Sequence, residues 1–391
     1  MNPRVALLDA LGQELAALDG REARRRRNPV EPLGGARVRA GGRELVAFCS
    51  NDYLGLAGHP ALVDAACAGA RQYGVGAGAA HLVSGHGPAH EHLESSLAAF
   101  AGTGEALLLS TGYMANAAVV TALAGRGDAL FADRLNHASL NDAALLSRAA
   151  FRRYPHGDLD ALERLLRDTP ARRRLVLVDG VFSMDGDIAP LPALHALCER
   201  HDALLVVDDA HGFGVLGREG RGVLSHFGIA SPRVVYMGTL GKAAGVFGAF
   251  VAADPRVIET LVNRARTYIF TTALPPLLAA ALSKSLELIV AGDALRERLR
   301  AHVDRLRAGL AGTSWRLLPS ETAIQPVVIG DNAAALAAAA RLRDRGFLVP
   351  AIRPPTVPPG TARLRIALSA AHSAADVDGL VAALRAIGTA E

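Results

Sequence analysis

The chain has 391 residues, of which 50% are hydrophobic and 20% are charged, and its formal net charge is +4. This length predicts two domains that share an interface, and the composition is typical of a soluble globular protein. The three cysteines are far apart and form no CxxC pair, so neither a disulfide framework nor a zinc cluster is predicted, which fits a reducing cytoplasm.

The N-terminal segment 1–46 is expected to form an arm. Residues 1–30 place apolar side chains at helical spacing up to Pro29, which predicts a basic helix. Residues 37–49 predict a hairpin that turns at a pair of glycines. The segment holds no apolar stretch of the signal-peptide type, so no secretory signal is predicted.

The densest charge in the arm is the run REARRRR, which holds five arginines within residues 21–27. We interpret it as a solvated helix face and not as a nucleic-acid site, because no aromatic side chains interleave with the arginines. A phosphate-bearing small molecule or an acidic carrier protein stays open as a partner for this run.

A large domain, 47–283, is predicted from short apolar runs that alternate with helical patterns. Valine and leucine occupy consecutive positions in several runs, which indicates strands covered on both faces and hence a largely parallel sheet. The uncharged stretch 106–125 holds polar residues near its middle, which predicts strand, turn and helix rather than a membrane span. The runs are EALLLS (105–110), DALFAD (128–133), RLVLVDG (174–180), ALLVVDDAH (203–211), VVYMGTL (234–240) and FGAFVAAD (247–254).

The segment after Pro275 and Pro276 changes character and predicts a smaller α+β domain, 284–391. A long helical stretch breaks near Gly292, and strand and helix patterns alternate after it. The overall prediction is an α/β protein whose large domain has a mostly parallel sheet flanked by helices. The C-terminal patterns are AIQPVVIG (323–330), NAAALAAAARLRDRG (332–346), ARLRIAL (362–368) and SAADVDGLVAALRAIG (373–388).

Polar side chains collect where the predicted strands end. Ligands of open α/β sheets bind at the carboxyl ends of the strands, so these residues are the first candidates for a functional site. They fall in segments 110–113, 133–139, 179–183, 208–211 and 239–242.

The segment HGFGVLG (211–217) matches a dinucleotide-binding fingerprint, but we reject this interpretation. The residues that follow do not predict the required helix, and no acidic residue for a ribose occurs between Glu219 and Asp254. Lys242 is followed by alanine instead of serine or threonine, which excludes a Walker A motif.

Four histidines gather in one stretch, at His81, His86, His90 and His92. Neither an HExxH motif nor a further ligand at a set spacing accompanies them. We therefore predict no metal site.

Lys242 stands among glycines and alanines in TLGKAAG, where a flat ligand can approach the backbone closely. A lysine with a lowered pKa can form a Schiff base with a carbonyl group, as in pyridoxal phosphate enzymes. Such a site also needs an acid that keeps the pyridine nitrogen protonated, and Asp208 stands at a strand end where it can do so. His137 is suited to stack on the ring, and residues 110–113 precede a helix whose N-terminus can bind a phosphate. The combination predicts a pyridoxal 5'-phosphate site.

A set of motifs spans nearly the whole chain in order. These motifs are SNDYLGL (50–56), GAAHLVSGHGPAHEHLE (78–94), STGYMAN (110–116), DRLNHASL (133–140), DGVFSMDGDIAPL (179–191), VDDAHGFGVLGREGRG (207–222), TLGKAAG (239–245), FTTALPP (270–276) and RLRIALSAAH (363–372). Together they resemble the α-oxoamine synthase family of fold-type-I pyridoxal-phosphate enzymes. The resemblance implies a homodimer with its sites at the subunit interface.

The resemblance implies roles for residues around the cofactor. Lys242 is matched to the lysine that binds the cofactor covalently, Asp208 to the partner of the pyridinium nitrogen and His211 to the partner of the phenolic oxygen. His137 is matched to the residue that stacks on the ring. The remaining cofactor contacts implied are Gly112, Tyr113, Ser183 and Thr239, with Thr271 or Thr272 reaching the phosphate of the partner subunit.

Further matches concern the substrates. Arg365 is matched to the arginine that binds the amino-acid carboxylate, and Asn51 and His137 lie on the same side of the implied site. Arg25 and Thr356 are matched to acyl-substrate contacts, although a neighbouring arginine of the basic run fits the first match too.

The segment 351–372 and the arginine-rich N-terminus resemble one branch of the family. That branch condenses L-alanine with a pimeloyl thioester and releases carbon dioxide and a free thiol, in biotin biosynthesis. The thioester is carried by coenzyme A or by an acyl-carrier protein, and the sequence leaves both open. The alternatives are a sister enzyme that joins glycine to a short acyl-CoA, and a non-catalytic interaction protein on a decayed enzyme fold.

Overall fold

Two compact units form the chain in the computed structural model, which describes residues 3–21 and 23–388. One unit is residues 51–300, and the other combines the chain up to residue 50 with the chain from residue 301. The predicted division, with limits near residues 46 and 283, differs from this one because the N-terminal hairpin pairs with a C-terminal strand. Residues 1–2, 22 and 389–391 of the predicted segments lie outside the described residues.

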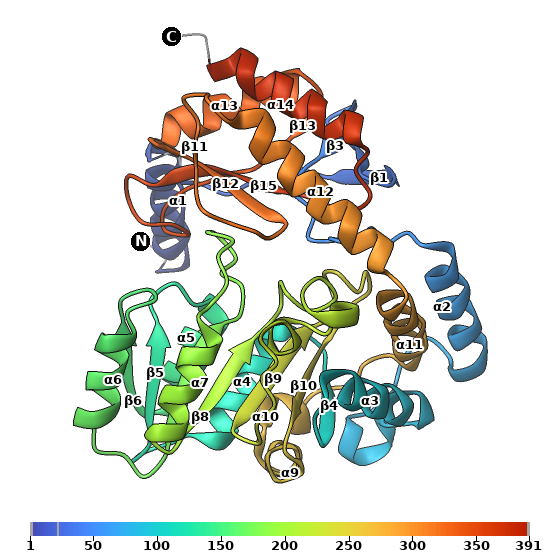
Figure 1. The fold of residues 1–391 in the computed structure, drawn as a ribbon, viewed down its shortest axis with the longest axis vertical. Coiled ribbons are helices and arrows are strands. Elements are labelled where there is room, and N and C mark those ends of the chain that lie inside the picture. Colours follow the sequence, from blue (N-terminus) through green and yellow to red (C-terminus); the bar gives the residue numbers. More distant parts are fainter. Residues whose placement is uncertain (1–2, 22, 389–391) are drawn as a thin grey trace. The chain divides into compact units, whose positions relative to one another are not determined.

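The larger unit contains a seven-stranded sheet, drawn as arrows between helices in Figure 1. Only β10 runs antiparallel to its neighbours, so the predicted mostly parallel sheet is confirmed. In spatial order the strands are β4 (Glu105–Leu109), β10 (Ala249–Ala253), β9 (Val234–Thr239), β8 (Ala203–Asp208), β7 (Arg174–Asp179), β5 (Ala129–Asp133) and β6 (Ala150–Tyr154).

Helices lie in the connections between these strands and in the segments before and after them. Their alanine and leucine side chains pack with the valine and leucine side chains of the strands in one buried core, as expected for strands covered on both faces. The helices are α2 (Pro60–Tyr73), α3 (Pro88–Ala101), α4 (Gly112–Leu123), α5 (Ala138–Ser147), α6 (Leu159–Asp168), α7 (Leu191–Arg200), α8 (Val223–Phe227), α9 (Pro255–Arg264), α10 (Arg266–Ile269) and α11 (Pro276–Val290), with short π and 3-10 turns at His81–Gly85 and Arg218–Gly220.

The register of the central strands aligns their carboxyl ends. Asp179, the last residue of β7, lies opposite Asp208, the last residue of β8, and Asp208 lies opposite Met237 of β9. The loops that follow these strands therefore start side by side, which brings residues distant in sequence to one edge of the sheet.

The second unit holds two four-stranded sheets. The first joins the predicted hairpin, β2 (Arg37–Ala40) and β3 (Arg43–Ala47), to β1 (Val30–Gly34) and to β13 (Phe347–Leu348). The second consists of β11 (Arg316–Leu317), β12 (Ile324–Gly330), β15 (Ala362–Ala367) and β14 (Ala351–Ile352). The remaining helices are α1 (Pro3–Gly20), α12 (Asp293–Leu310), α13 (Asn332–Asp344) and α14 (Ala374–Gly388).

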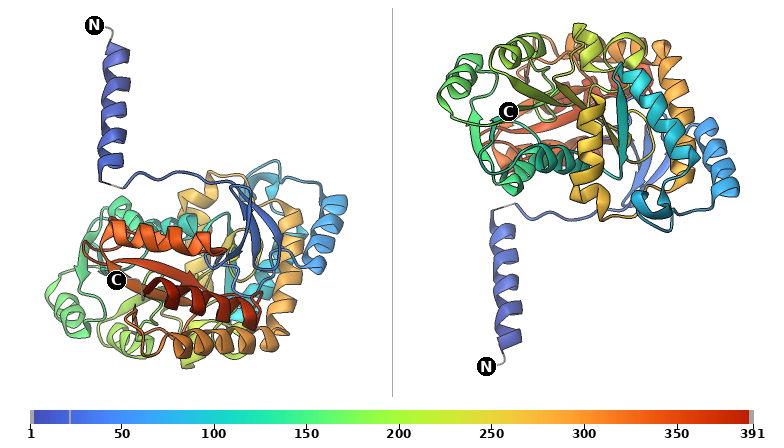
Figure 2. Two further views of the ribbon diagram at one scale, coloured as in Figure 1. Left: turned by 90° about the horizontal axis from the view of Figure 1, so that it is seen from above. Right: turned by 90° about the horizontal axis from the view of Figure 1, so that it is seen from below.

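The predicted N-terminal helix is shorter than expected, because α1 ends at Gly20 instead of reaching Pro29. Figure 2 shows α1 as a straight helix followed by an extended segment. Glycine favours a helix end, and consecutive arginines would repel one another on one helical turn. The interpretation of the basic run as a helix face was therefore wrong, since residues 23–29 have no helical structure.

Candidate active site

A cavity of about 190 Å³ lies at the carboxyl ends of β7, β8 and β9. It brings together eight of the residues proposed from the sequence, which come from the ends of five different strands. Its lining is Gly112, Tyr113, His137, Ser139, Asp179, Val181, Ser183, Asp208, Ala210, His211, Met237, Thr239 and Lys242.

Lys242 ends a chain of hydrogen bonds that runs through His211 and Tyr53. The Lys242 Nζ atom lies 2.9 Å from His211 Nε2, and His211 Nδ1 lies 2.5 Å from the Tyr53 hydroxyl. The Tyr53 hydroxyl in turn donates to Asn51 Oδ1 at 3.1 Å. Since that proton goes to Asn51, His211 donates through Nδ1 to the tyrosine and accepts from Lys242 through Nε2. The tautomer of His211 is thereby fixed.

Close backbone approach supports this chain. Gly245 has a φ of +71°, and a Cβ atom there would lie 2.6 Å from the backbone nitrogen of Ala57. Only glycine fits such a position, so the Lys242 loop can lie directly against the segment that carries Tyr53 and Asn51.

Asp208 is 5% exposed and is held by neutral donors. Its Oδ2 atom accepts from Asn116 Nδ2 at 2.7 Å, and its Oδ1 atom accepts from the backbone nitrogen of Ala210 at 3.0 Å. The same amide of Asn116 also donates to the Ser139 hydroxyl at 2.8 Å. Among the residues that the structure describes, Asp208 has no ion-pair partner. A buried carboxylate in such a setting favours a cationic hydrogen-bond donor from a ligand.

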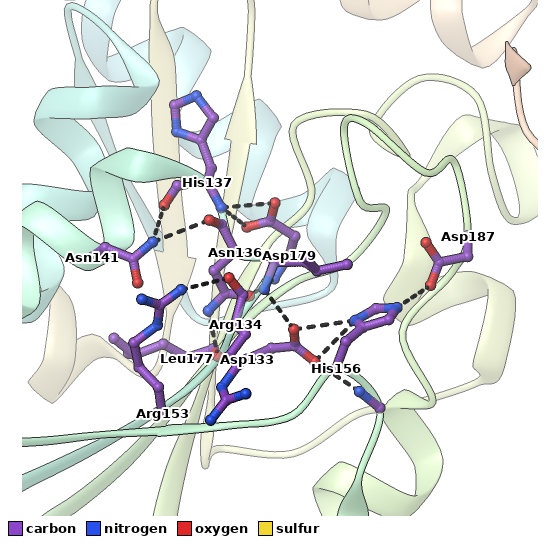
Figure 3. A network of polar contacts seen from close by, with 12 residues as sticks. Asp133, Arg134, Asn136, His137, Asn141, Arg153, His156, Leu177, Asp179 and Asp187 are labelled. Carbon is purple, nitrogen blue, oxygen red and sulfur yellow. Dashed lines mark hydrogen bonds and ion pairs between the residues drawn. The ribbon is translucent and has the colours of Figure 1, made fainter. Parts of the chain in front are cut away.

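Asp179 lies beside Asp208 and holds the start of α5. Its two carboxyl oxygens accept from the backbone nitrogen of His137 at 3.1 and 3.0 Å. Burial, together with the neighbouring charge of Asp208, raises the pKa of Asp179 well above its usual range. The imidazole of His137 caps α5 and points away from Asp179 in Figure 3, toward the cavity that it lines.

The N-terminus of α4 forms another wall of the cavity. Thr111 caps the helix by accepting from the backbone nitrogen of Met114 at 3.1 Å. Gly112 and Tyr113 follow at the first turn, and the Thr239 hydroxyl lies 4.0 Å from where a Cβ atom of Gly112 would stand. A helix N-terminus with free backbone N–H groups beside a hydroxyl is a suitable site for a phosphate.

Ser183 reaches the cavity from the loop after β7. This loop is closed by backbone hydrogen bonds, among them Phe182 N to Asp187 O at 3.0 Å and Ala189 N to Gly180 O at 3.0 Å. The loop also carries Asp187, which belongs to the polar network of Figure 3.

The other predicted site residues do not line this cavity. Arg365 is 6% exposed on β15, and Thr356 is exposed in the loop before it, both in the second unit. The Arg25 side chain donates to the Thr356 hydroxyl at 3.1 Å, so the two residues matched to acyl contacts do meet. Thr272 pairs with Ala80 in an isolated bridge beside Thr271, in the larger unit.

Sequence reasoning gave no role in the site to Tyr53, Asn116, Ser139 or Asp179, although Ser139 and Asp179 lie in the strand-end segments that it selected. Asn116 offered a signal in the sequence, because it is an amide among alanines and valines of the predicted helix, and the structure buries it fully. A buried amide in such a helix requires a polar partner.

The largest of the other hollows described is a weaker candidate for a functional site. A hollow of about 770 Å³ lies at the amino ends of the strands, but its arginines bind their own neighbours, such as Arg233 with Asp202 and Arg256 with Asp254. Within residues 3–21 and 23–388, no group of three or more His, Cys, Asp or Glu side chains is arranged to hold a metal ion. In the same part of the chain, every helix is too short or too polar to cross a bilayer.

The chain is similar to known enzymes over nearly its whole length. The family model for class I and II aminotransferases matches residues 43–384, and the chain belongs to this family. A structure of serine palmitoyltransferase from S. paucimobilis with bound PLP superposes with a TM-score of 0.92 at 30% identity, covering 99% of this chain and 98% of that one. The fold is therefore that of the fold-type-I enzymes, as predicted.

The particular relatives are 8-amino-7-oxononanoate synthases. The one from Nitrosospira multiformis is 62% identical over 97% of this chain and 96% of its own length. A crystal structure of the one from Francisella tularensis has a TM-score of 0.76 at 28% identity, covering 88% of this chain and 97% of that one. The resemblance found from the motifs is confirmed.

Proposed function

We propose that the chain condenses L-alanine with a pimeloyl thioester to give 8-amino-7-oxononanoate, carbon dioxide and a free thiol, in biotin biosynthesis. The observation that carries this proposal is the convergence of Lys242, His211 and Asp208 on one cavity, in a chain that is 62% identical to a named synthase. The three residues come from two strand ends and supply an amine, an imidazole and a carboxylate.

The cofactor is pyridoxal 5'-phosphate, and the residues present fit it. Asp208 is a buried carboxylate without a cationic partner among the described residues, which suits a protonated ring nitrogen. The first turn of α4 with Thr239 suits the phosphate, and Lys242 suits the aldehyde. When bound, the cofactor supplies an electron sink for the bond that breaks at the amino-acid carbon.

Each protein group has a task that its surroundings support. Lys242 Nζ takes the proton from the amino-acid carbon and later returns one to the product, since it is the amine of the cavity. His211, its tautomer fixed by Tyr53, keeps Nε2 as an acceptor toward Lys242 and would contact the phenolic oxygen of the bound cofactor. Asp208 would hold the ring nitrogen of the bound cofactor protonated, and His137, at the N-terminus of α5, would stack on the ring.

Further residues bind the substrates and the partner subunit in this proposal. Arg365 binds the carboxylate of L-alanine, where a guanidinium can make two parallel hydrogen bonds, and Asn51 lines the substrate side of the site. Arg25 and Thr356, which are hydrogen-bonded to each other, contact the acyl substrate. The enzyme acts as a cytoplasmic homodimer in which Thr271 or Thr272 reaches the partner's phosphate. The donor is pimeloyl-CoA or a pimeloyl-acyl-carrier protein.

The test is thiol release by the purified protein from pimeloyl-CoA, with L-alanine, glycine and L-serine in parallel. Alanine-dependent release together with the amino ketone product is the expected result. Release only with glycine and a short acyl-CoA would move the function to the sister enzyme. Release only with L-serine and a long acyl-CoA would follow the structural likeness to serine palmitoyltransferase instead. No release with any pair would overturn the proposal.

A further inference from the structure

His156 connects two carboxylates that stand on different connections of the sheet (Figure 3). Its Nδ1 atom lies 3.1 Å from both carboxyl oxygens of Asp133, and its Nε2 atom lies 3.0 Å from Asp187 Oδ2. Because a carboxylate only accepts hydrogen bonds, both ring nitrogens carry hydrogen and the ring is a cation. The two carboxylates raise the pKa of His156 to about 10, which agrees with this geometry.

Asp133 makes one end of this bridge immobile. It is the last residue of β5 and is 2% exposed. Its carboxylate also accepts from the backbone nitrogens of Leu135 at 2.8 Å and Gly157 at 3.0 Å. The turn that carries His156 is thus fixed to the sheet through several hydrogen bonds at once.

Asp187 makes the other end, and it belongs to the loop that carries Ser183. The loop folds on itself through the bridge between Val181 and Ile188. The His156 ring also packs edge-on against Phe182, with ring centroids 4.4 Å apart and an angle of 85°. Among the described residues, His156 is the only ion-pair partner of Asp187.

We propose that His156 is a positioning residue that holds Ser183 against the cofactor by bridging Asp133 to Asp187. The ring acts at both ends of the short segment 182–187, through Phe182 and through Asp187. Ser183 lies next to Phe182 and lines the cavity, so the placement of its hydroxyl depends on the loop. This inference rests on the proposed function for its effect on cofactor binding, but not for its effect on the loop.

Asp187→Ala is the cleanest variant, because it releases the loop and leaves the pair between His156 and Asp133 intact. Hydrogen exchange of the backbone amides of Phe182, Gly186 and Ala189 in the cofactor-loaded protein reports directly on the loop. We expect exchange about tenfold faster or more in Asp187→Ala, with no change in β7 and β8. Asp187→Asn keeps an acceptor for His156 Nε2 and should stay close to the wild type.

Glu163→Ala is the matched control. It removes a carboxylate of similar exposure that binds Arg200 at 2.8 Å and His201 at 3.5 Å, between α6 and α7. Exchange in the loop should not change in this variant. Equal acceleration in the control would mean that the loop responds to any lost ion pair, which would overturn the proposal.

A double-mutant cycle with Ser183→Ala tests whether the bridge acts through that hydroxyl. The dissociation constant for pyridoxal phosphate, measured by absorbance titration, should rise about tenfold in Asp187→Ala and much less in the Ser183→Ala background. An equal rise in the dissociation constant with and without Ser183→Ala would contradict the proposal. Unchanged hydrogen exchange in the loop of Asp187→Ala would contradict it too. Faster loop exchange in a protein that binds no cofactor would uphold the bridge and reject the proposed function instead.

Discussion

Lys242 Nζ lies 2.9 Å from His211 Nε2, although the two residues are 31 positions apart in the sequence. The contact exists because β8 and β9 are neighbours whose carboxyl ends are in register. His211 is oriented from its far side by Tyr53, so the amine of Lys242 meets an imidazole whose hydrogen position is already determined. The geometry of the amine is therefore set by three chain segments together.

The role of Lys242 in binding the cofactor covalently can be tested with a matched control, because the sequence contains only one other lysine, Lys284. Borohydride reduction of the cofactor-loaded protein should attach the cofactor to the peptide with Lys242 alone, as seen by mass spectrometry. Lys242→Ala should abolish turnover, while Lys284→Ala on α11 should retain it. Substantial turnover by Lys242→Ala would remove that residue from the mechanism.

Tyr53→Phe should weaken the orientation of His211. It deletes the hydroxyl that accepts from His211 Nδ1 and donates to Asn51 Oδ1. We expect kcat/KM to fall about five- to tenfold, as for one or two lost hydrogen bonds, and the pH profile of kcat to shift. Tyr73→Phe, at the end of α2, is the control. An unchanged pH profile in Tyr53→Phe would show that the tyrosine does not act through the histidine.

Asp208→Asn and Asp179→Asn should differ strongly, although the two acids are neighbours in the sheet. Asp208→Asn removes the charge facing the ring nitrogen and should lower kcat about a hundredfold or more. Burial and the charge of Asp208 raise the pKa of Asp179, so losing its charge costs little, and the amide oxygen of asparagine still accepts from the His137 backbone nitrogen. The kcat of Asp179→Asn should therefore fall by no more than about tenfold. Similar losses in both variants, measured by steady-state kinetics, would contradict this assignment.

Glu94→Gln should stabilise the protein at alkaline pH. Burial raises the pKa of Glu94 to about 8, from 4.5, although its carboxylate accepts from the Leu108 backbone nitrogen at 2.7 Å. The unfolded chain therefore loses this proton first as the pH rises, and the folded state loses stability between pH 4.5 and about 8. The variant removes this loss while keeping an acceptor for Leu108.

The expected gain for Glu94→Gln is near zero at about pH 4 and on the order of 2 kcal/mol above about pH 8, measured by urea unfolding. Glu297→Gln serves as the control, since Glu297 is an exposed glutamate on α12. A gain that does not depend on pH would mean that burial of the charge is not the cause.

Local pattern was sufficient to predict the parallel strands and the residues at their ends. Consecutive valines and leucines mark buried strands, and this signal is contained in each short run. Contacts between distant segments could not be predicted in this way. Asn116 meets Asp208 across 92 positions and Tyr53 meets His211 across 158, and neither pairing leaves a trace in the local sequence.

The N-terminal helix was predicted to be too long, because the local apolar pattern continues beyond the point where the helix ends. Apolar spacing continued to suggest a helix up to Pro29, but α1 ends at Gly20. The hairpin after it was predicted correctly, yet its membership in the C-terminal unit depends on the pairing of β3 with β13, across 301 positions.

The single reversed strand of the large sheet has a consequence for the reactive amine. Because β10 returns antiparallel beside β9, the Lys242 segment is a tight reversal and not the start of a helical crossover. Leu240 N donates to Gly248 O at 2.8 Å, and Gly245 N donates to Lys242 O at 2.8 Å. The peptide around the lysine is anchored from both directions, so the amine can travel only by rotating its own four-carbon tether. The swing of one side chain thereby sets how far the nitrogen reaches, and lengthening this reversal by a single residue would misplace it.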